Sequence, residues 1–150
     1  MRFRLAMWGD LPDIAELVRM HYDSTGFVAD VEYDEATVQF SLNAMAVNPD
    51  CILFVAVHEE RCIGVLALQI ATTFFSKDRA ARELFLYIRP EFRGQHAGVT
   101  MIQMGESWAK AKGAVSMIIG DHPLSPAHVA ETYIRYGYRK AQSDFIRKLT

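Results

Sequence analysis

Apolar and polar residues follow a pattern that predicts strand and helix in the first third of the chain. Residues 2–6 alternate polar and apolar, as expected for a half-buried strand. Two segments with apolar residues at helical spacing follow, the first with Ile14, Leu17, Val18 and Tyr22 and the second with Val38, Leu42, Met45 and Ala46. Asp10 and Asp34 precede these segments, so both are predicted to cap helices, and Asn48-Pro49 ends the second.

The middle of the chain has the long apolar runs of sheet strands. Residues 51–57 are apolar on both faces, which predicts a central strand, and residues 61–75 predict another long strand. If the two pair as a hairpin around Glu59-Glu60, Cys51 lies opposite about residue 68, and the two cysteines are separated by roughly 20 Å along the ladder. We therefore expect no disulfide between Cys51 and Cys62.

The second half predicts a further strand, a helix and a return to the sheet. A polar turn over 76–82 leads to a strand at 84–88, and a helical face follows, made by Met101, Ile102, Gly105, Trp108 and Ala109. Residues 114–120 predict a short strand parallel to 84–88, and a helix from Ser125 to Tyr136 should stop at Gly137. Residues 138–149 predict a terminal strand pair or one bent strand. The whole pattern predicts a mixed sheet with helices on both faces.

Size and composition exclude several classes of protein. A chain of 150 residues, half of them apolar, fits one domain with a substantial core. The net charge of -2 gives no overall attraction to nucleic acid or to an anionic membrane. No apolar run reaches the ~20 residues of a membrane span and no signal peptide is recognisable, so we expect a cytoplasmic protein. The cysteines lack zinc-ligand spacing, and no metal site is expected.

Residues 84–112 carry the clearest chemical signal. A buried strand leads through a loop, Arg93 to Gly98, into the amphipathic helix. The first turn of a helix leaves backbone N–H groups unpaired and carries partial positive charge. We therefore expect an anionic ligand at Gly94 to Val99, although glycines in such a loop can also serve only to make a turn.

The loop resembles a known motif. Leu86 to Gln95, followed by Ala97-Gly98, resembles the acyl-CoA motif of GNAT superfamily N-acetyltransferases, in which Arg or Gln, two residues, Gly and one residue precede Gly or Ala. His96 replaces the middle glycine of that pattern. The resemblance covers essentially the full chain. It implies one acyl-CoA N-acyltransferase domain over 1–150 with an α/β (α+β) fold and a mixed, mostly antiparallel central sheet of six to seven strands.

The same resemblance implies how acetyl-CoA would bind as co-substrate. The pantetheine arm would pair with the backbone of Leu86 and Ile88, in the manner of an added strand. The diphosphate would lie against the loop and the first turn of the helix, formed by Arg93, Gly94, Gln95, His96, Ala97, Gly98 and Val99. The guanidinium of Arg93 suits phosphate oxygens.

The base that would neutralise the amine has several candidates. Glu83 stands just before the strand, where many family members place a carboxylate that acts directly or through water. The competing interpretation is a surface charge paired with Arg79 or Arg82. Asp121 and His122, after the next strand, are alternative bases.

The segment Tyr133 to Tyr138 resembles the family's ending of Tyr, three residues, Gly and an aromatic residue. By that resemblance the Tyr133 phenol is the general acid that protonates the leaving thiolate. The competing interpretation is a core tyrosine, because Val129, Ala130 and Tyr133 form an apolar stripe. Phe27, by resemblance, belongs to a loop that borders the acceptor; otherwise it only fills the gap between two helices.

Taken together, these features predict an N-acetyltransferase that moves an acetyl group directly from acetyl-CoA to a primary amine. The alternative is a non-catalytic acyl-CoA-binding or regulatory module of the same fold, and a third is a domain that binds another nucleotide. The sequence does not identify the acceptor amine. Family members often dimerise, so the resemblance also allows a homodimer.

Overall fold

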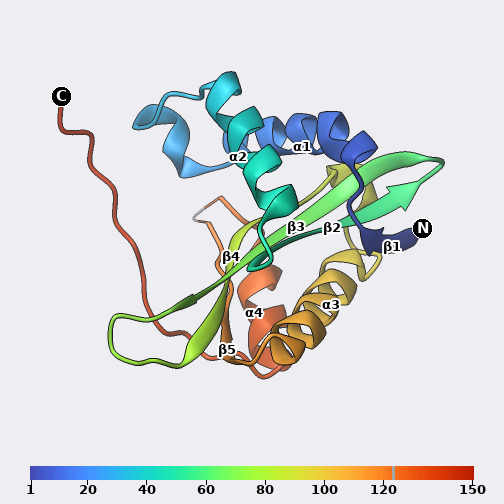
Figure 1. Ribbon diagram of the computed structural model, residues 1–150. Coiled ribbons are helices and arrows are strands. Elements are labelled where there is room, and N and C mark those ends of the chain that lie inside the picture. The colour runs from blue at the N-terminus through green and yellow to red at the C-terminus, as the bar shows by residue number, and fades with distance from the viewer. Residues whose placement is uncertain (123) are drawn as a thin grey trace.

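The computed structural model describes residues 1–122 and 124–150 and contains one sheet with helices on both sides (Figure 1). Its strands are β1 (Arg2–Leu5), β2 (Cys51–His58), β3 (Arg61–Thr72), β4 (Arg79–Ile88) and β5 (Ala114–Ile118). The α-helices are α1 (Leu11–Asp23), α2 (Glu35–Val47), α3 (Ala97–Ala111) and α4 (His128–Arg135). Short 3-10 turns occupy Trp8–Asp10, Gly26–Ala29 and Pro90–Phe92.

The strands lie in the order β1-β2-β3-β4-β5. All neighbours are antiparallel except β4 and β5, which are parallel and joined through α3. Helices α1 and α2 cover one face of the sheet, and α3 and α4 lie on the other (Figure 1). This confirms the predicted α/β fold, with a mixed sheet between two helical layers.

The β2–β3 hairpin confirms the predicted pairing. Cys51 lies opposite Gln69, one position from the prediction. Glu59 and Glu60 form the turn with φ of 48° and 62°, which are left-handed backbone conformations. Cys51 and Cys62 are both free thiols, as expected from their separation.

The two predicted helix caps have different outcomes. The Asp34 carboxylate accepts the Thr37 N–H at 2.9 Å and caps α2 as predicted. The Asp10 carboxylate does not cap α1; it accepts the Met7 N–H at 2.7 Å and pairs with the Arg4 guanidinium at 2.6 Å. Arg4 holds the pKa of the Asp10 carboxyl below its usual value. The ion pair between Asp10 and Arg4 has thus replaced the predicted cap of α1.

Each face of the sheet has its own core. The layer under α1 and α2 includes Ile14, Leu17, Leu42, Val55 and Val65. The layer under α3 includes Leu66, Leu68 and Met101, all completely buried, and the apolar face predicted for this helix is the one that packs. Gly105 allows close approach, because a β-carbon there would lie 2.6 Å from the Leu68 side chain. This packing fixes where α3 begins relative to β4.

Strand β4 begins earlier than the sequence pattern predicts. The predicted polar turn over 76–82 is wrong in its second half, where β4 already pairs with β3 from Arg79 onward. Ala80 and Ala81 are buried, and small side chains of this kind give little hydrophobic signal in a polar sequence. Strand β3 correspondingly ends at Thr72 rather than Phe75.

The predicted number of strands, six to seven, is wrong, because the described residues form five. The missing strand is the one predicted over 138–149, which has no strand or helix. Two of its apolar side chains lie in solvent, with Phe145 98% and Leu149 92% exposed. Alternation of polar and apolar residues shows that a segment can pair in a sheet, but it does not supply the neighbouring strand.

Among the described residues, no helix has the length and apolar character required to cross a membrane.

Candidate active site

The site begins where β4 and β5 separate. Their pairing runs only from Arg79–Ala114 to Arg82–Ile118, although β4 continues to Ile88. From residue 83 onward β4 remains paired with β3 on one side, and no strand of the described residues lies beside its other edge. The Ile88 carbonyl at this edge accepts a hydrogen bond of 2.9 Å from Nε of Arg93. An unpaired strand edge is where an extended ligand can add.

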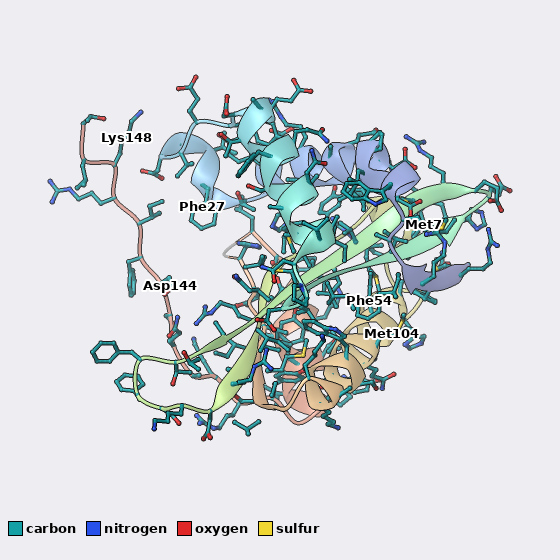
Figure 2. The ribbon with its side chains drawn as sticks, viewed as in Figure 1. Met7, Phe27, Phe54, Met104, Asp144 and Lys148 are labelled. Carbon is teal, nitrogen blue, oxygen red and sulfur yellow. The ribbon has the colours of Figure 1, made fainter. Side chains whose placement is uncertain are left out.

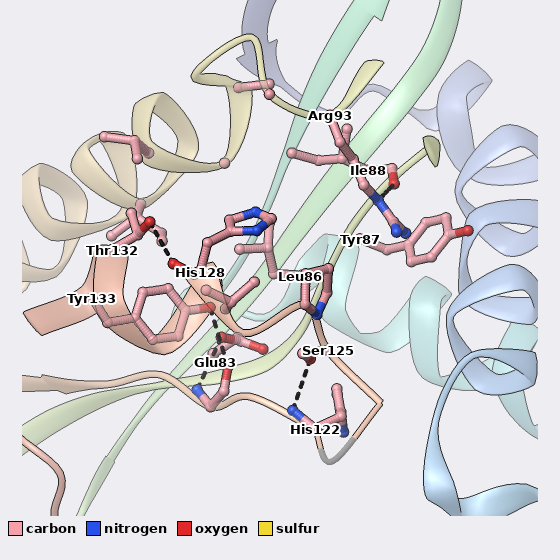
Figure 3. Close-up of a pocket in the computed structure, with 18 of the residues that line it drawn as sticks. Glu83, Leu86, Tyr87, Ile88, Arg93, His122, Ser125, His128, Thr132 and Tyr133 are labelled. Carbon is pink, nitrogen blue, oxygen red and sulfur yellow. Dashed lines mark hydrogen bonds between the residues drawn. The ribbon is translucent and has the colours of Figure 1, made fainter. Parts of the chain in front are cut away.

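A cavity of about 400 Å³ occupies this opening. Strand β4, the loop before α3, the segment after β5 and helix α4 form its walls, as Figure 3 shows. Of the site residues predicted from sequence, those lining it are Glu83, Leu86, Ile88, Arg93, Gly94, His96, Ala97, Gly98, Val99 and Tyr133. Gln95 is exposed and is not among the described residues that line the cavity. The structure therefore brings the predicted donor loop, strand and catalytic candidates to one place.

The loop before α3 delivers free backbone donors to the cavity. The first helical hydrogen bond of α3 runs from the Thr100 N–H to the His96 carbonyl, so the N–H groups of residues 97–99 precede the ladder. Gly94 has φ of 80° and His96 has φ of 60°, both left-handed. Glycine adopts this conformation without cost, whereas histidine pays for its β-carbon. The helix start thus has the positive end and open donors that suit an anion.

Glu83 is half-buried and lines the cavity. Its carboxylate accepts the Gly120 N–H at 3.2 Å, and burial raises the pKa of Glu83 to about 7. The alternative pairing with Arg79 is wrong, because Arg79 pairs with Asp50 and donates to the Lys112 carbonyl at 3.0 Å. A carboxyl that titrates near neutral pH can both accept and return a proton there.

Tyr133 of α4 contacts the same residue, Gly120, through its carbonyl. Its hydroxyl donates to the Gly120 carbonyl at 3.1 Å, so Gly120 contacts both Glu83 and Tyr133 (Figure 3). Burial, with smaller contributions from Glu83 and Asp121, raises the pKa of the Tyr133 phenol. The phenol therefore remains protonated at neutral pH and is available as a donor.

The two other candidate bases are placed differently. His122 lines the cavity, and its backbone N–H donates to the Ser125 hydroxyl at 2.9 Å. Asp121 is exposed and does not belong to the described lining. Phe27 lies edge-on to His122, with ring centroids 6.3 Å apart, so its loop does border the cavity.

His21 of α1, which sequence reasoning did not select as a site residue, lines the cavity. Its ring lies 5.1 Å from His122 and 5.9 Å from Tyr87, both in edge-on contacts. Burial, and to a lesser extent His122, lowers the pKa of His21 to about 4, so this imidazole is neutral at pH 7. His21 lies on the apolar face of α1, and the spacing of apolar residues does not distinguish a residue in a cavity wall from one in the core.

Helix α4 supplies further lining residues that the sequence did not single out, namely His128, Val129, Thr132, Arg135 and Tyr136. Only the Tyr133 position had a motif to mark it. The described residues contain no group of three or more side chains suited to hold a metal ion.

The fold and the sequence both match known proteins. A sequence profile described as the Acetyltransferase (GNAT) family matches residues 12–133. No curated protein is significantly similar to the chain. Among solved structures, aminoglycoside antibiotic 6'-N-acetyltransferase AAC(6')-IG from Acinetobacter haemolyticus has a TM-score of 0.74 at 16% identity, with 100% of each chain covered.

Two further structures show the same architecture. AAC(6')-Iy, in complex with a bisubstrate analogue, has a TM-score of 0.79 at 14% identity and covers 99% of this chain and 98% of its own. Ribosomal-protein-alanine N-acetyltransferase from Brucella melitensis has a TM-score of 0.72 at 12% identity and covers 99% of this chain and 100% of its own. At such identities these neighbours establish the fold. The profile, which spans most of the sequence, establishes that the chain belongs to the acetyltransferase (GNAT) family.

Proposed function

We propose that the protein transfers an acetyl group from acetyl-CoA directly to a primary amine. The observation that carries this proposal is the meeting, in one cavity, of the open edge of β4, the start of α3, Glu83 and Tyr133. Neither cysteine lines the described cavity, which favours direct transfer over an acyl-enzyme.

The chain offers two complementary surfaces for the donor. The N–H groups of residues 97–99 suit a diphosphate, and the edge of β4 at Leu86 and Ile88 suits the amide-containing pantetheine arm. Arg93 links the two surfaces, because it now donates to the Ile88 carbonyl. Its guanidinium can release that carbonyl and pair with phosphate oxygens instead. The family relation, and the CoA-containing analogue bound to AAC(6')-Iy, support acetyl-CoA as the donor.

Acetyl-CoA supplies an acetyl group that is activated as a thioester. The acceptor amine must lose its proton before it can attack that group. An alkylammonium has a pKa near 10.4, so a base must take its proton. Glu83, with a pKa of about 7, is a stronger base than an exposed carboxylate and is ionised in about half of the molecules at neutral pH. The Glu83 carboxylate then holds the proton at the cavity wall, directly or through one water.

The leaving thiolate needs a proton or a strong donor. Tyr133 keeps its proton because its pKa is raised, and its hydroxyl turns from the Gly120 carbonyl to donate to the sulfur. A free thiol has a pKa near 8.5, so hydrogen-bond donation by a phenol stabilises the charge that develops on sulfur. Glu83 and Tyr133, which contact the N–H and the carbonyl of Gly120, therefore take the roles of base and acid.

The acceptor would enter beside His21 and His122, at the end of the cavity that the Phe27 loop borders. The structural neighbours named above act on acceptors as different as an aminoglycoside and a ribosomal-protein alanine. Their names therefore do not select one acceptor for this chain.

Replacing Tyr133 by Phe removes the hydroxyl and little else. We expect kcat with acetyl-CoA and a responsive amine to fall by roughly 10²-fold or more, with CoA affinity unchanged. A thiol-release assay over a panel of amines measures this, and Tyr136→Phe, which alters a neighbouring cavity phenol, should remain active. If the wild type acetylates no amine in the panel although it binds CoA, the non-catalytic module is the better account.

Replacing Glu83 by Gln tests the base through activity and stability together. Wild-type activity should rise with pH through about 7, and the variant should lose that inflection along with roughly 10²-fold or more of kcat. The folded-state pKa lies above the ordinary 4.5, so wild-type stability falls as pH rises from about 4.5 to 7.

The Gln variant should escape this loss and unfold with a free energy about 1–3 kcal/mol higher than the wild type at pH 8, but not at pH 4. Denaturant titration at the two pH values measures the difference. The exposed Glu91→Gln is the control. Equal stability differences at pH 4 and pH 8 would show that Glu83 is not held with a raised pKa.

Replacing His96 by Gly tests the departure from the family's loop pattern. Glycine tolerates the left-handed backbone at this position and removes a side chain from the diphosphate site, so CoA should bind more tightly and the fold should stay intact. Isothermal titration calorimetry measures the affinity, with Gln95→Gly as the control for added loop flexibility. A marked loss of affinity would instead identify the imidazole as a ligand contact.

A further inference from the structure

Helix α4 has few attachments to the rest of the protein. None of its residues is fully buried, so packing alone holds this helix weakly. In the part of the chain that the structure describes, only two hydrogen bonds join residues 126–138 to residues outside that segment. The Tyr133 hydroxyl donates to the Gly120 carbonyl at 3.1 Å. The Tyr138 hydroxyl donates to Oε1 of Glu106, a residue of α3, at 2.7 Å.

Tyr138 is also bonded to the backbone of Tyr133. Its N–H donates to the Tyr133 carbonyl at 3.0 Å, and the Gly137 N–H donates to the Ile134 carbonyl at 3.0 Å. With Gly137 at φ of 92°, these two bonds form the Schellman motif that ends α4. The rings of Tyr133 and Tyr138 lie 6.2 Å apart, and an apolar contact between these two positions is common in that motif. A movement of Tyr138 therefore carries Tyr133 with it.

Helix α3, to which Tyr138 is bonded, is held firmly by the core. Met104 of α3 packs against the buried cluster that contains Phe54 of β2 (Figure 2). Glu106 comes two residues later and lines a second, small cavity of about 50 Å³ between α3 and α4. Because this cavity leaves part of the contact between the two helices unfilled, the hydrogen bond to Glu106 contributes what close packing does not. The same helix begins at residues 97–99, the proposed diphosphate site.

The proposed reaction depends on this second attachment. To donate to the sulfur, the Tyr133 hydroxyl must leave the Gly120 carbonyl, and α4 then loses one of its two hydrogen bonds to the rest of the protein. The bond between Tyr138 and Glu106 is the one that remains. Burial, followed by the hydrogen bond to Glu106, raises the pKa of the Tyr138 phenol. The phenol therefore keeps its proton at neutral pH and stays a donor throughout the reaction.

We propose that Glu106 and Tyr138 are positioning residues for the general acid, and that their hydrogen bond holds Tyr133 within reach of the donor sulfur after its hydroxyl leaves Gly120. Neither Glu106 nor Tyr138 is among the described residues that line the larger cavity, so both act through Tyr133. A phenylalanine at position 138 would satisfy the aromatic sequence pattern but could not form this bond. The inference rests on the proposed role of Tyr133 as the acid.

Kinetics of matched variants test the positioning role. Tyr138→Phe keeps the ring and the backbone bonds but removes the hydroxyl, so kcat should fall by roughly 10-fold while the CoA dissociation constant, measured by calorimetry, stays unchanged. Glu106→Leu should cause the same fall. Glu106→Gln keeps a side-chain oxygen as acceptor and should retain most of the activity. Glu131→Gln, which alters an exposed carboxyl of α4, is the control.

A double variant distinguishes positioning from general loosening of the fold. In a Tyr133→Phe background, Tyr138→Phe should lower kcat no further, because the hydroxyl that it positions is already gone. An unchanged kcat in Tyr138→Phe alone, or an equal fall in both backgrounds, would overturn the proposal.

Fluorine NMR tests the same bond without any turnover. The chain has six tyrosines, and 3-fluorotyrosine gives each of them a signal, with Tyr133→Phe identifying that of Tyr133. In Glu106→Leu the Tyr133 signal should shift and broaden, whereas in Glu106→Gln it should keep its wild-type position; Tyr22 of α1 is the internal reference. A Tyr133 signal that Glu106→Leu leaves unchanged would overturn the proposal even in an active enzyme. An inactive wild type that shows the shift would contradict the proposed activity but support the positioning of Tyr133.

Discussion

The separation of β4 from β5 is the constraint on which the rest of this structure depends. Two parallel strands that pair over their first residues and then diverge leave the backbone groups of one strand edge without a neighbour. Buried backbone groups must find partners, and here the Ile88 carbonyl finds the Arg93 side chain. The opening is kept in place because both strands also pack under α3, whose Gly105 allows close contact with Leu68 of β3 and Met117 of β5. The cavity is thus a consequence of the sheet geometry and not of a loose loop.

Gly120 organises the chemistry inside that opening. Its N–H faces Glu83 and its carbonyl faces Tyr133, so the backbone of one residue orients a carboxyl from β4 and a phenol from α4. Burial raises the pKa of the Glu83 carboxyl and of the Tyr133 phenol, and the two shifts suit the two groups to different roles. The carboxyl titrates near neutral pH, as a base should, and the phenol keeps its proton, as a donor should. Position and electrostatics therefore favour the same assignment of roles.

The sequence predicted the parts of the fold that follow from periodicity and local chemistry. The buried face of α3 and the β2–β3 hairpin were predicted correctly because apolar residues at a fixed spacing must be buried together. The loop before α3 was recognised from Arg93 and Gly98 by its resemblance to a family motif. Asp10 was predicted wrongly as a cap, because the preference of the nearby Arg4 for its carboxylate depends on the tertiary structure.

Other features had no local signal at all. The earlier start of β4 at Arg79 depends on small alanines, and the lining role of His21 depends on which neighbours α1 meets. Residues 138–149 have the pattern of a strand, yet a pattern cannot specify the strand beside which it will lie. The site residues themselves were predicted by resemblance to a family motif, which is a different kind of information from periodicity.

The most direct test of this account is a crystal structure of the protein with CoA bound. The account predicts the diphosphate against the N–H groups of residues 97–99, the pantetheine arm along the open edge of β4 at Leu86 and Ile88, and the sulfur next to the Tyr133 hydroxyl. It also predicts that the Arg93 guanidinium leaves the Ile88 carbonyl. CoA bound elsewhere, or a β4 edge closed by protein while CoA is present, would contradict it.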